Sequence, residues 1–132
     1  MKRILVFFII GVVFFGGCSA QSANAQNANI AQRIIGTWVN HTGEVTWLFN
    51  ANGNLTIRYS DGITQGFRFG VTDSKLFYYD PADANGAFSN YSIYNISISS
   101  DGRTLILEGT QYSMDNRFNF GEQRRGYLLT KQ

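Results

Sequence analysis

Few residues in this chain of 132 residues could carry out catalysis or bind a metal. His41 is the only histidine, and a Ser-His-Asp or Cys-His site would need it as the base, but nothing near it suggests such a site. Cys18 is the only cysteine, which excludes an intramolecular disulfide and a cysteine metal site. Aspartates stand in predicted turns, where they cap and bend the backbone: Asp61, Asp73, Asp80, Asp83 and Asp101. We therefore predict no enzyme activity, no catalytic residue, no metal site and no cofactor.

Aromatic residues at alternating positions are stronger candidates for a site. Four of the eleven Phe precede residue 18, which leaves seven Phe, seven Tyr and two Trp in the rest of the chain. The rings that we expect to face inward are those of Trp47, Phe49, Tyr59, Phe67, Phe69 and Tyr78. They either fill the interior of a narrow barrel or line an apolar pocket that is open at one end. Inward tyrosine hydroxyls need hydrogen-bond partners, which favours a wet or ligand-occupied cavity.

A positive charge is also expected inside. Arg125, Tyr127 and Leu129 share one face of the last predicted strand, because side chains alternate along a strand. If Leu129 points inward, the Arg125 guanidinium does too, and it then needs a partner. That partner is either Trp38 with a backbone carbonyl, or the carboxylate of an amphiphilic ligand. We therefore add Arg125 and Tyr127 to the predicted ligand-binding interior, and predict that Trp38 and Arg125 close one end of the barrel.

The elements that must position these residues are short. Residues 30–35 predict one helical turn, which Gly36 ends. Beyond it, apolar and polar residues alternate in stretches that are separated by Gly, Asp and Asn turns. We expect strands at residues 37–40, 44–50, 55–59, 67–71, 76–79, 91–99, around 105–107, and at 124–130. The apolar positions change phase near Ile93, which predicts a β-bulge, and residues 111–123 form a loop or part of a further hairpin.

About eight short strands without a long helix indicate an all-β sandwich or barrel. Nearly every predicted connection is a tight hairpin, so consecutive strands should pair as neighbours. Such a sheet leaves two bare edges unless it closes, and an immunoglobulin-like sandwich would need longer crossover connections. We therefore predict that residues 30–132 form an all-β domain, a closed antiparallel up-and-down β-barrel of about eight strands.

The first 29 residues predict export. Lys2 and Arg3 precede an apolar run of about a dozen residues, and a transmembrane helix needs about 20, so residues 1–17 are predicted to be a signal peptide. Residues 19–29 contain only Ser, Ala, Asn and Gln, and we expect residues 18–29 to be a flexible tether. Without Lys2 and Arg3 the eleven basic residues become nine, equal to the nine acidic ones. Nucleic acid is therefore not an expected partner.

The segment Phe15-Gly16-Gly17-Cys18-Ser19 resembles the lipobox of bacterial lipoproteins, with Phe15 at a position that is usually aliphatic. The resemblance implies that Cys18 becomes the lipidated first residue of the mature protein, which makes a membrane its partner. Cleavage after Ala20 or Ala25 would instead release a secreted protein that lacks Cys18. The expected location is the bacterial cell envelope, lipid-anchored at the outer membrane or periplasmic face, and otherwise secreted.

Gly36-Thr37-Trp38, the turn at residues 49–53, the turn at residues 100–102 and the ending Leu128-Leu129-Thr130-Lys131 together resemble the lipocalin-like (calycin) domains of small bacterial lipoproteins. The resemblance covers residues 34–131. It implies a closed barrel with an interior cavity or a packed core, and Trp38 at the closed end beneath an arginine from near the end of the barrel. Arg124 and Arg125 are the candidates.

Two functions remain open at this point. A binding module of the envelope would hold a small hydrophobic or amphiphilic ligand inside the barrel. An interaction or inhibitor module would dock on another envelope protein through its loops, especially residues 80–90 and 111–123. A void of several hundred cubic ångströms favours the first function, and a filled core favours the second.

Overall fold

β-strands form most of the described structure. The computed structural model describes residues 30–81, 89–113, 121–122 and 126–132. Within these ranges it has one helical turn, at residues 30–33, and nine strands. They are β1 (Gly36–Asn40), β2 (Val45–Phe49), β3 (Asn54–Tyr59), β4 (Thr64–Thr72), β5 (Lys75–Asp80), β6 (Ser89–Ile98), β7 (Thr104–Ser113), β8 (Gly121–Glu122) and β9 (Tyr127–Lys131).

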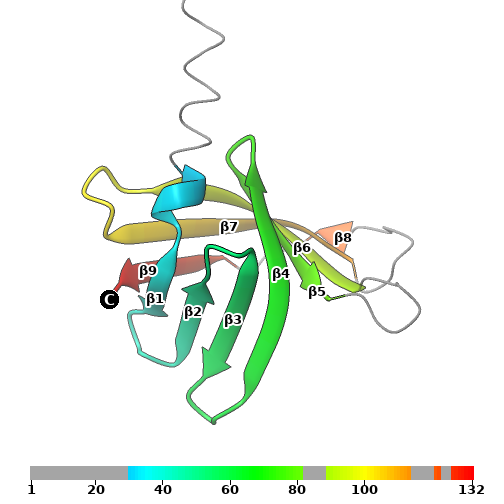
Figure 1. The fold of residues 1–132 in the computed structure, drawn as a ribbon, viewed down its shortest axis with the longest axis horizontal. Coiled ribbons are helices and arrows are strands. Elements are labelled where there is room, and N and C mark those ends of the chain that lie inside the picture. Colours follow the sequence, from blue (N-terminus) through cyan, green and yellow to red (C-terminus); the bar gives the residue numbers. More distant parts are fainter. Residues whose placement is uncertain (1–29, 82–88, 114–120, 123–125) are drawn as a thin grey trace, which may run out of the picture.

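The strands follow chain order around a closed ring (Figure 1). Each strand from β1 to β7 pairs antiparallel with the next, and β9 pairs with both β7 and β1. The two-residue strand β8 pairs with the second half of β7. The predicted fold, a closed antiparallel up-and-down barrel of eight strands, is therefore confirmed, and it is compatible with a lipocalin-like fold.

The strand bounds differ from the expected ones mainly in the second half of the chain. β4 begins at Thr64, and β7 runs on to Ser113. Residues 111–112 pair with residues 121–122 of β8, so the hairpin alternative for this stretch is the one that the described residues support. The predicted bulge lies where expected, because the register of β6 and β7 shifts between Ile93 and Tyr94. Its extra residue is Thr110 of β7, however, and the Thr110 hydroxyl donates to the Ile93 carbonyl at 2.9 Å. The phase change that we expected near Ile93 was wrong, since Ser92, Tyr94 and Ile96 are buried in strict alternation. The irregularity within β6 lies earlier, between Ser89 and Ser92, opposite the end of β5.

The core lies inside the ring and comes from alternate residues of the strands. Val45, Trp47 and Phe49 of β2 are buried, while the residues between them are not. This period of two is what a strand with one face on an apolar core requires. The fully buried side chains of the other strands include Leu55, Leu76, Tyr94, Leu105, Leu107 and Leu129.

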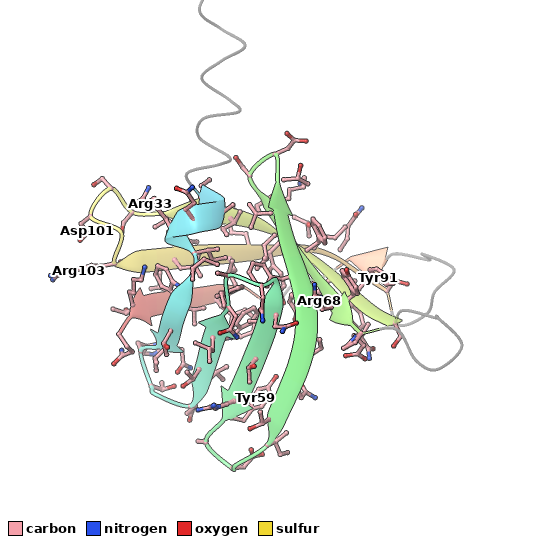
Figure 2. The ribbon with its side chains drawn as sticks, in the orientation of Figure 1. Arg33, Tyr59, Arg68, Tyr91, Asp101 and Arg103 are labelled. Atoms are coloured by element: carbon pink, nitrogen blue, oxygen red, sulfur yellow. The ribbon has the colours of Figure 1, made fainter. Side chains whose placement is uncertain are left out.

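The barrel has two different ends. The helix end holds residues 30–35, the start of β1 and the turns β2–β3, β4–β5 and β6–β7 (Figure 1). At the opposite end, which we call the pocket end, β4 and β6 begin and β5 stops. The guanidinium of Arg33 donates to the carbonyl of Ser99, which ties the helical turn to the β6–β7 turn. Figure 2 shows Arg33 beside the Asp101–Arg103 segment of that turn.

Trp38 lies buried against the helical turn at the helix end. Its side chain is fully buried, and its indole nitrogen donates to the Ile34 carbonyl at 2.6 Å. The Nζ atom of Lys131 lies 5.2 Å from the centre of the indole ring and donates to the Arg33 carbonyl at 3.2 Å. Gly36 has a φ of +129°, and a Cβ there would lie 3.2 Å from Cε of Lys131. Glycine at the start of β1 therefore leaves the space through which the lysine reaches the ring.

Candidate functional site

The aromatic side chains inside the barrel pack mainly against one another. Trp47 lies at the centre of the group, with ring centroids 5.0 Å from Tyr127, 5.6 Å from Tyr78 and 5.9 Å from Phe49. Phe49 continues the group to Phe69 at 5.0 Å. Most of these pairs are tilted or edge-to-face, which is the favoured geometry for aromatic contacts. The middle of the barrel is therefore a packed aromatic core.

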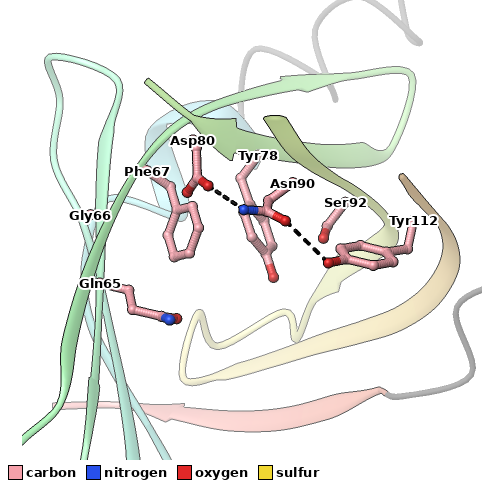
Figure 3. A pocket seen from close by; sticks show the side chains of 8 residues that line it. All are labelled: Gln65, Gly66, Phe67, Tyr78, Asp80, Asn90, Ser92 and Tyr112. Carbon is pink, nitrogen blue, oxygen red and sulfur yellow. Dashed lines mark hydrogen bonds between the residues drawn. The ribbon is translucent and has the colours of Figure 1, made fainter. Parts of the chain in front are cut away.

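A pocket remains at the pocket end of the barrel. Its volume is about 420 Å³, which lies within the range of small-molecule sites. The described residues that line it come from β4, β5, β6 and β7 (Figure 3), and they are Gln65, Gly66, Phe67, Tyr78, Asp80, Asn90, Ser92 and Tyr112. Phe67 and Tyr78 form an aromatic corner, with their ring centroids 4.9 Å apart and their planes at 62°. The rest of this lining carries amide, carboxylate and hydroxyl groups.

A hydrogen-bonded chain runs across the polar wall of this pocket. The Tyr112 hydroxyl donates to Oδ1 of Asn90 at 3.2 Å, and the Asn90 amide donates to Oδ2 of Asp80 (Figure 3). The Ser89 hydroxyl donates to the same Asp80 oxygen at 3.3 Å. Asn90 has a φ of +51°, a conformation that asparagine adopts more readily than most residues. The wall is thus held in place before any ligand arrives, and its chain of donors ends on a carboxylate.

Tyr78 stands between the core and the pocket. Burial raises the pKa of its hydroxyl, while hydrogen bonds with the side chains of Ser92 and Tyr94 act in the opposite direction. The phenol is therefore neutral at neutral pH and can offer both its hydroxyl and its ring. Ser92 is itself buried, with an exposed fraction of 3%. Its hydroxyl lies on the inner face of β6, where the hydroxyl of Tyr78 gives it a partner.

The predicted interior residues divide between the core and the pocket. Trp47, Phe49 and Phe67 are buried, and Tyr59, Phe69, Tyr78 and Tyr127 are partly buried against the core. Two of them, Phe67 and Tyr78, line the pocket. The others in this set are not part of that lining, so most of the predicted ligand-binding rings serve the packed interior instead. Whether any of them binds a ligand stays a prediction.

Several lining residues were missed by the sequence reasoning. Asp80 had a usable signal, because it stands two positions after Tyr78 and therefore shares its face of β5. The expectation that residue 80 begins a loop hid this relation. Ser92 had the same kind of signal, because it stands two positions before Tyr94, but the phase change expected near Ile93 hid it. Asn90 and Tyr112 had no such signal, because each stands beyond a shift of register between neighbouring strands.

Other predicted residues lie elsewhere or outside the described part of the chain. His41 is in the β1–β2 turn, as expected, and is exposed. Arg124, Arg125 and Cys18 are outside the described residues, so the lipidation site and the arginine that we expected over Trp38 stay predictions. Among the described residues, the cation over Trp38 is Lys131.

The loops of the interaction hypothesis lie largely outside the described structure, since it leaves out residues 82–88 and 114–120. That hypothesis therefore stays a prediction. Within the described ranges, no helix is long and apolar enough to span a bilayer. The same ranges contain no group of three or more potential metal-binding side chains.

The chain matches no protein-family model, no curated protein and no solved structure. Its function must therefore be argued from the geometry of the barrel.

Proposed function

We propose that this domain is a binding module that holds a small amphiphilic molecule in the pocket at the pocket end of the barrel. The observation that carries the proposal is the pocket of about 420 Å³ beyond the packed aromatic core. An apolar part of the ligand would lie against the corner of Phe67 and Tyr78. Its polar part would meet the side chains of Asp80, Asn90 and Tyr112. The aromatic corner gives such a ligand an apolar contact, and the polar groups that make up most of the lining would fix its orientation.

We further propose that the module works in the cell envelope. Residues 1–17 would direct export, Cys18 would carry a lipid anchor, and residues 18–29 would tether the barrel to the membrane. The intact mass and detergent-phase partitioning of the expressed protein test this point. A lipid-sized mass increase that Cys18→Ser abolishes is expected. A mature protein that begins after Ala20 or Ala25 would contradict the anchor but not the pocket.

A pocket-filling variant tests the binding function. Gln65 lines the pocket and is exposed, so Gln65→Trp would place an indole in the space that the ligand needs. Thr64→Trp is the matched control, because Thr64 is the adjacent exposed residue of β4 and faces the other side of the strand. The probe is N-phenyl-1-naphthylamine, a small aromatic amphiphile whose fluorescence rises in an apolar site.

We expect saturable binding by the wild type and by Thr64→Trp, and an affinity at least about tenfold lower for Gln65→Trp, since the bulky side chain competes for the same volume. Absence of saturable binding by the wild type would overturn the proposal for ligands of this class. Equal affinities of the two tryptophan variants would show that the probe binds outside the pocket, and this result would also contradict the proposal.

A further inference from the structure

The charge of the pocket lining is one-sided. Among the eight described residues that line the pocket, Asp80 is the only one whose side chain is charged at neutral pH, and none of the eight is Lys, Arg or His. The described Lys and Arg residues lie elsewhere: Arg33, Lys75, Arg103 and Lys131 belong to the helix end, and Arg58 and Arg68 are exposed on β3 and β4. A carboxylate ligand would therefore meet a like charge at this wall, whereas a cationic ligand would meet a counter-ion.

The direction of the hydrogen bonds points the same way. The Tyr112 hydroxyl donates its proton to Asn90, and the Asn90 amide donates one of its protons to Asp80. This chain leaves the lone pairs of the Tyr112 hydroxyl available as acceptors. Ser89 and Asn90 both bond to Oδ2 of Asp80, so these two bonds leave Oδ1 as a further acceptor. Acceptor groups of Asp80 and Tyr112 therefore belong to the lining, beside the amide of Gln65, which can both donate and accept.

The aromatic corner adds the second half of a cation site. Phe67 and Tyr78 meet at 62° with their ring centroids 4.9 Å apart, and both line the same pocket as Asp80. Tyr78 and Asp80 are two positions apart on β5, so the phenol ring and the carboxylate project from the same face of one strand. Aromatic faces beside a carboxylate are the usual environment for an organic ammonium group, which is attracted to both the rings and the charge.

We propose that the pocket selects an organic ammonium cation, with Asp80 as the counter-ion and with Phe67 and Tyr78 as the aromatic walls. This inference rests on the proposed binding function and specifies its ligand class. It opposes one of the two alternatives given for Arg125, in which the guanidinium receives a ligand carboxylate, because the two predict opposite ligand charges. The ligand's ammonium group would lie at Asp80, and its apolar part would extend along the aromatic corner.

Competition between three matched compounds tests the selection. Decyltrimethylammonium, decanol and decanoate share a ten-carbon chain and differ in the charge of the head group. Each is used below its aggregation concentration to displace N-phenyl-1-naphthylamine from the wild type, from Asp80→Asn and from Glu108→Gln. Glu108 is an exposed carboxylate on the outer face of β7, so its variant removes the same charge from outside the pocket.

We expect the cation to bind the wild type and Glu108→Gln at least about tenfold more tightly than decanol or decanoate does, an advantage typical of partly desolvated cation–π and ionic contacts. Asp80→Asn should lose most of that advantage and keep its affinity for decanol, which also shows that the variant is folded. Equal binding of cation and alcohol, or tighter binding of decanoate, would overturn the ammonium assignment and leave the pocket function standing. Failure of the probe to bind the wild type would overturn both.

Discussion

Trp38 and Trp47 provide a matched test of what a buried indole donor contributes to this barrel. The exposed fractions of their side chains are 0% and 1%. The Trp38 nitrogen donates to the Ile34 carbonyl at 2.6 Å, whereas the Trp47 nitrogen has no hydrogen-bond partner among the described residues. The rings around Trp47 offer at most a weak N–H···π contact. Because a Phe substitution removes the same atoms at both positions, the difference between the two variants reports on the hydrogen bond.

We expect Trp38→Phe to lower the free energy of unfolding by about 2–4 kcal/mol more than Trp47→Phe does. Loss of the hydrogen bond to Ile34 costs about 1 kcal/mol net. Removal of the unpaired donor of Trp47 recovers about 1–3 kcal/mol of desolvation free energy. The smaller ring leaves a similar void in both variants, so the packing loss largely cancels in the comparison.

Urea unfolding followed by far-UV circular dichroism measures both variants with the same probe, and an unchanged m value shows that the transitions are comparable. Each variant keeps one of the two tryptophans, so its fluorescence supplies a second, local signal. Equal losses in the two variants, or a larger loss for Trp47→Phe, would refute the reasoning. Either result would mean that the Trp47 nitrogen has an acceptor in the folded protein.

Three further predictions concern a close approach of two strands, the cation at the helix end and one turn. A Cβ at Gly126 would lie 2.8 Å from a carbonyl oxygen of β7, so Gly126→Ala should lower the free energy of unfolding by about 1–3 kcal/mol. A Cβ at Gly66 would have no atom within 4 Å, so Gly66→Ala should change the free energy of unfolding by less than about 1 kcal/mol. Urea unfolding compares the two variants, and equal effects would contradict the predicted clash. Lys131→Met keeps the aliphatic packing but removes the ammonium group, and we expect a loss of about 0.5–1 kcal/mol, which thermal unfolding measures; an unchanged melting temperature would show that the cation contributes nothing. Hydrogen bonds from a serine hydroxyl and then from a backbone amide in the β6–β7 turn hold the pKa of Asp101 below its ordinary 3.8. The ionised carboxylate therefore stabilises the fold above pH 3.8, and this stability is lost as the pH falls through the lowered pKa of the folded state. The wild type should therefore lose stability relative to Asp101→Asn on acidification, and parallel stability–pH curves would contradict this.

The barrel itself could be predicted because its signals are local. The alternation of Val45, Trp47 and Phe49, and the Gly-containing turns after β2 and β3, specify strands and hairpins without knowledge of distant residues. Tight turns then force consecutive strands to pair, and closure follows from the number of strands. The bulge between β6 and β7 was located from a change in the apolar pattern near Ile93, but the buried residues of β6 show no change of face there. The extra residue is Thr110, and nothing in the local pattern of β7 marks it.

The site could be predicted only in part, because it depends on register between distant strands. Inward rings were recognised by period, but the period does not say which rings pack on one another and which face a void. Trp47 illustrates the limit, since its four aromatic neighbours come from β2, β5, β6 and β9. The contact of Lys131 with Trp38 was also missed. It depends on the pairing of β1 with β9, which brings together residues from the two ends of the barrel sequence.

The antiparallel pairing of β1 with β9, which closes the barrel, also constrains when this barrel can form. Lys131 reaches the Arg33 carbonyl across 98 positions of sequence, so the chain must close its longest loop to make this contact. Closing such a loop has an entropic cost and slows folding, and the partner edge of β1 stays unpaired until residues 127–131 have been synthesised. Until then β9 cannot pair with β1 and β7, so the ring of strands stays open. If residues 1–17 direct export as proposed, late pairing of β9 leaves the barrel open while the chain crosses the membrane, and the barrel closes on the far side.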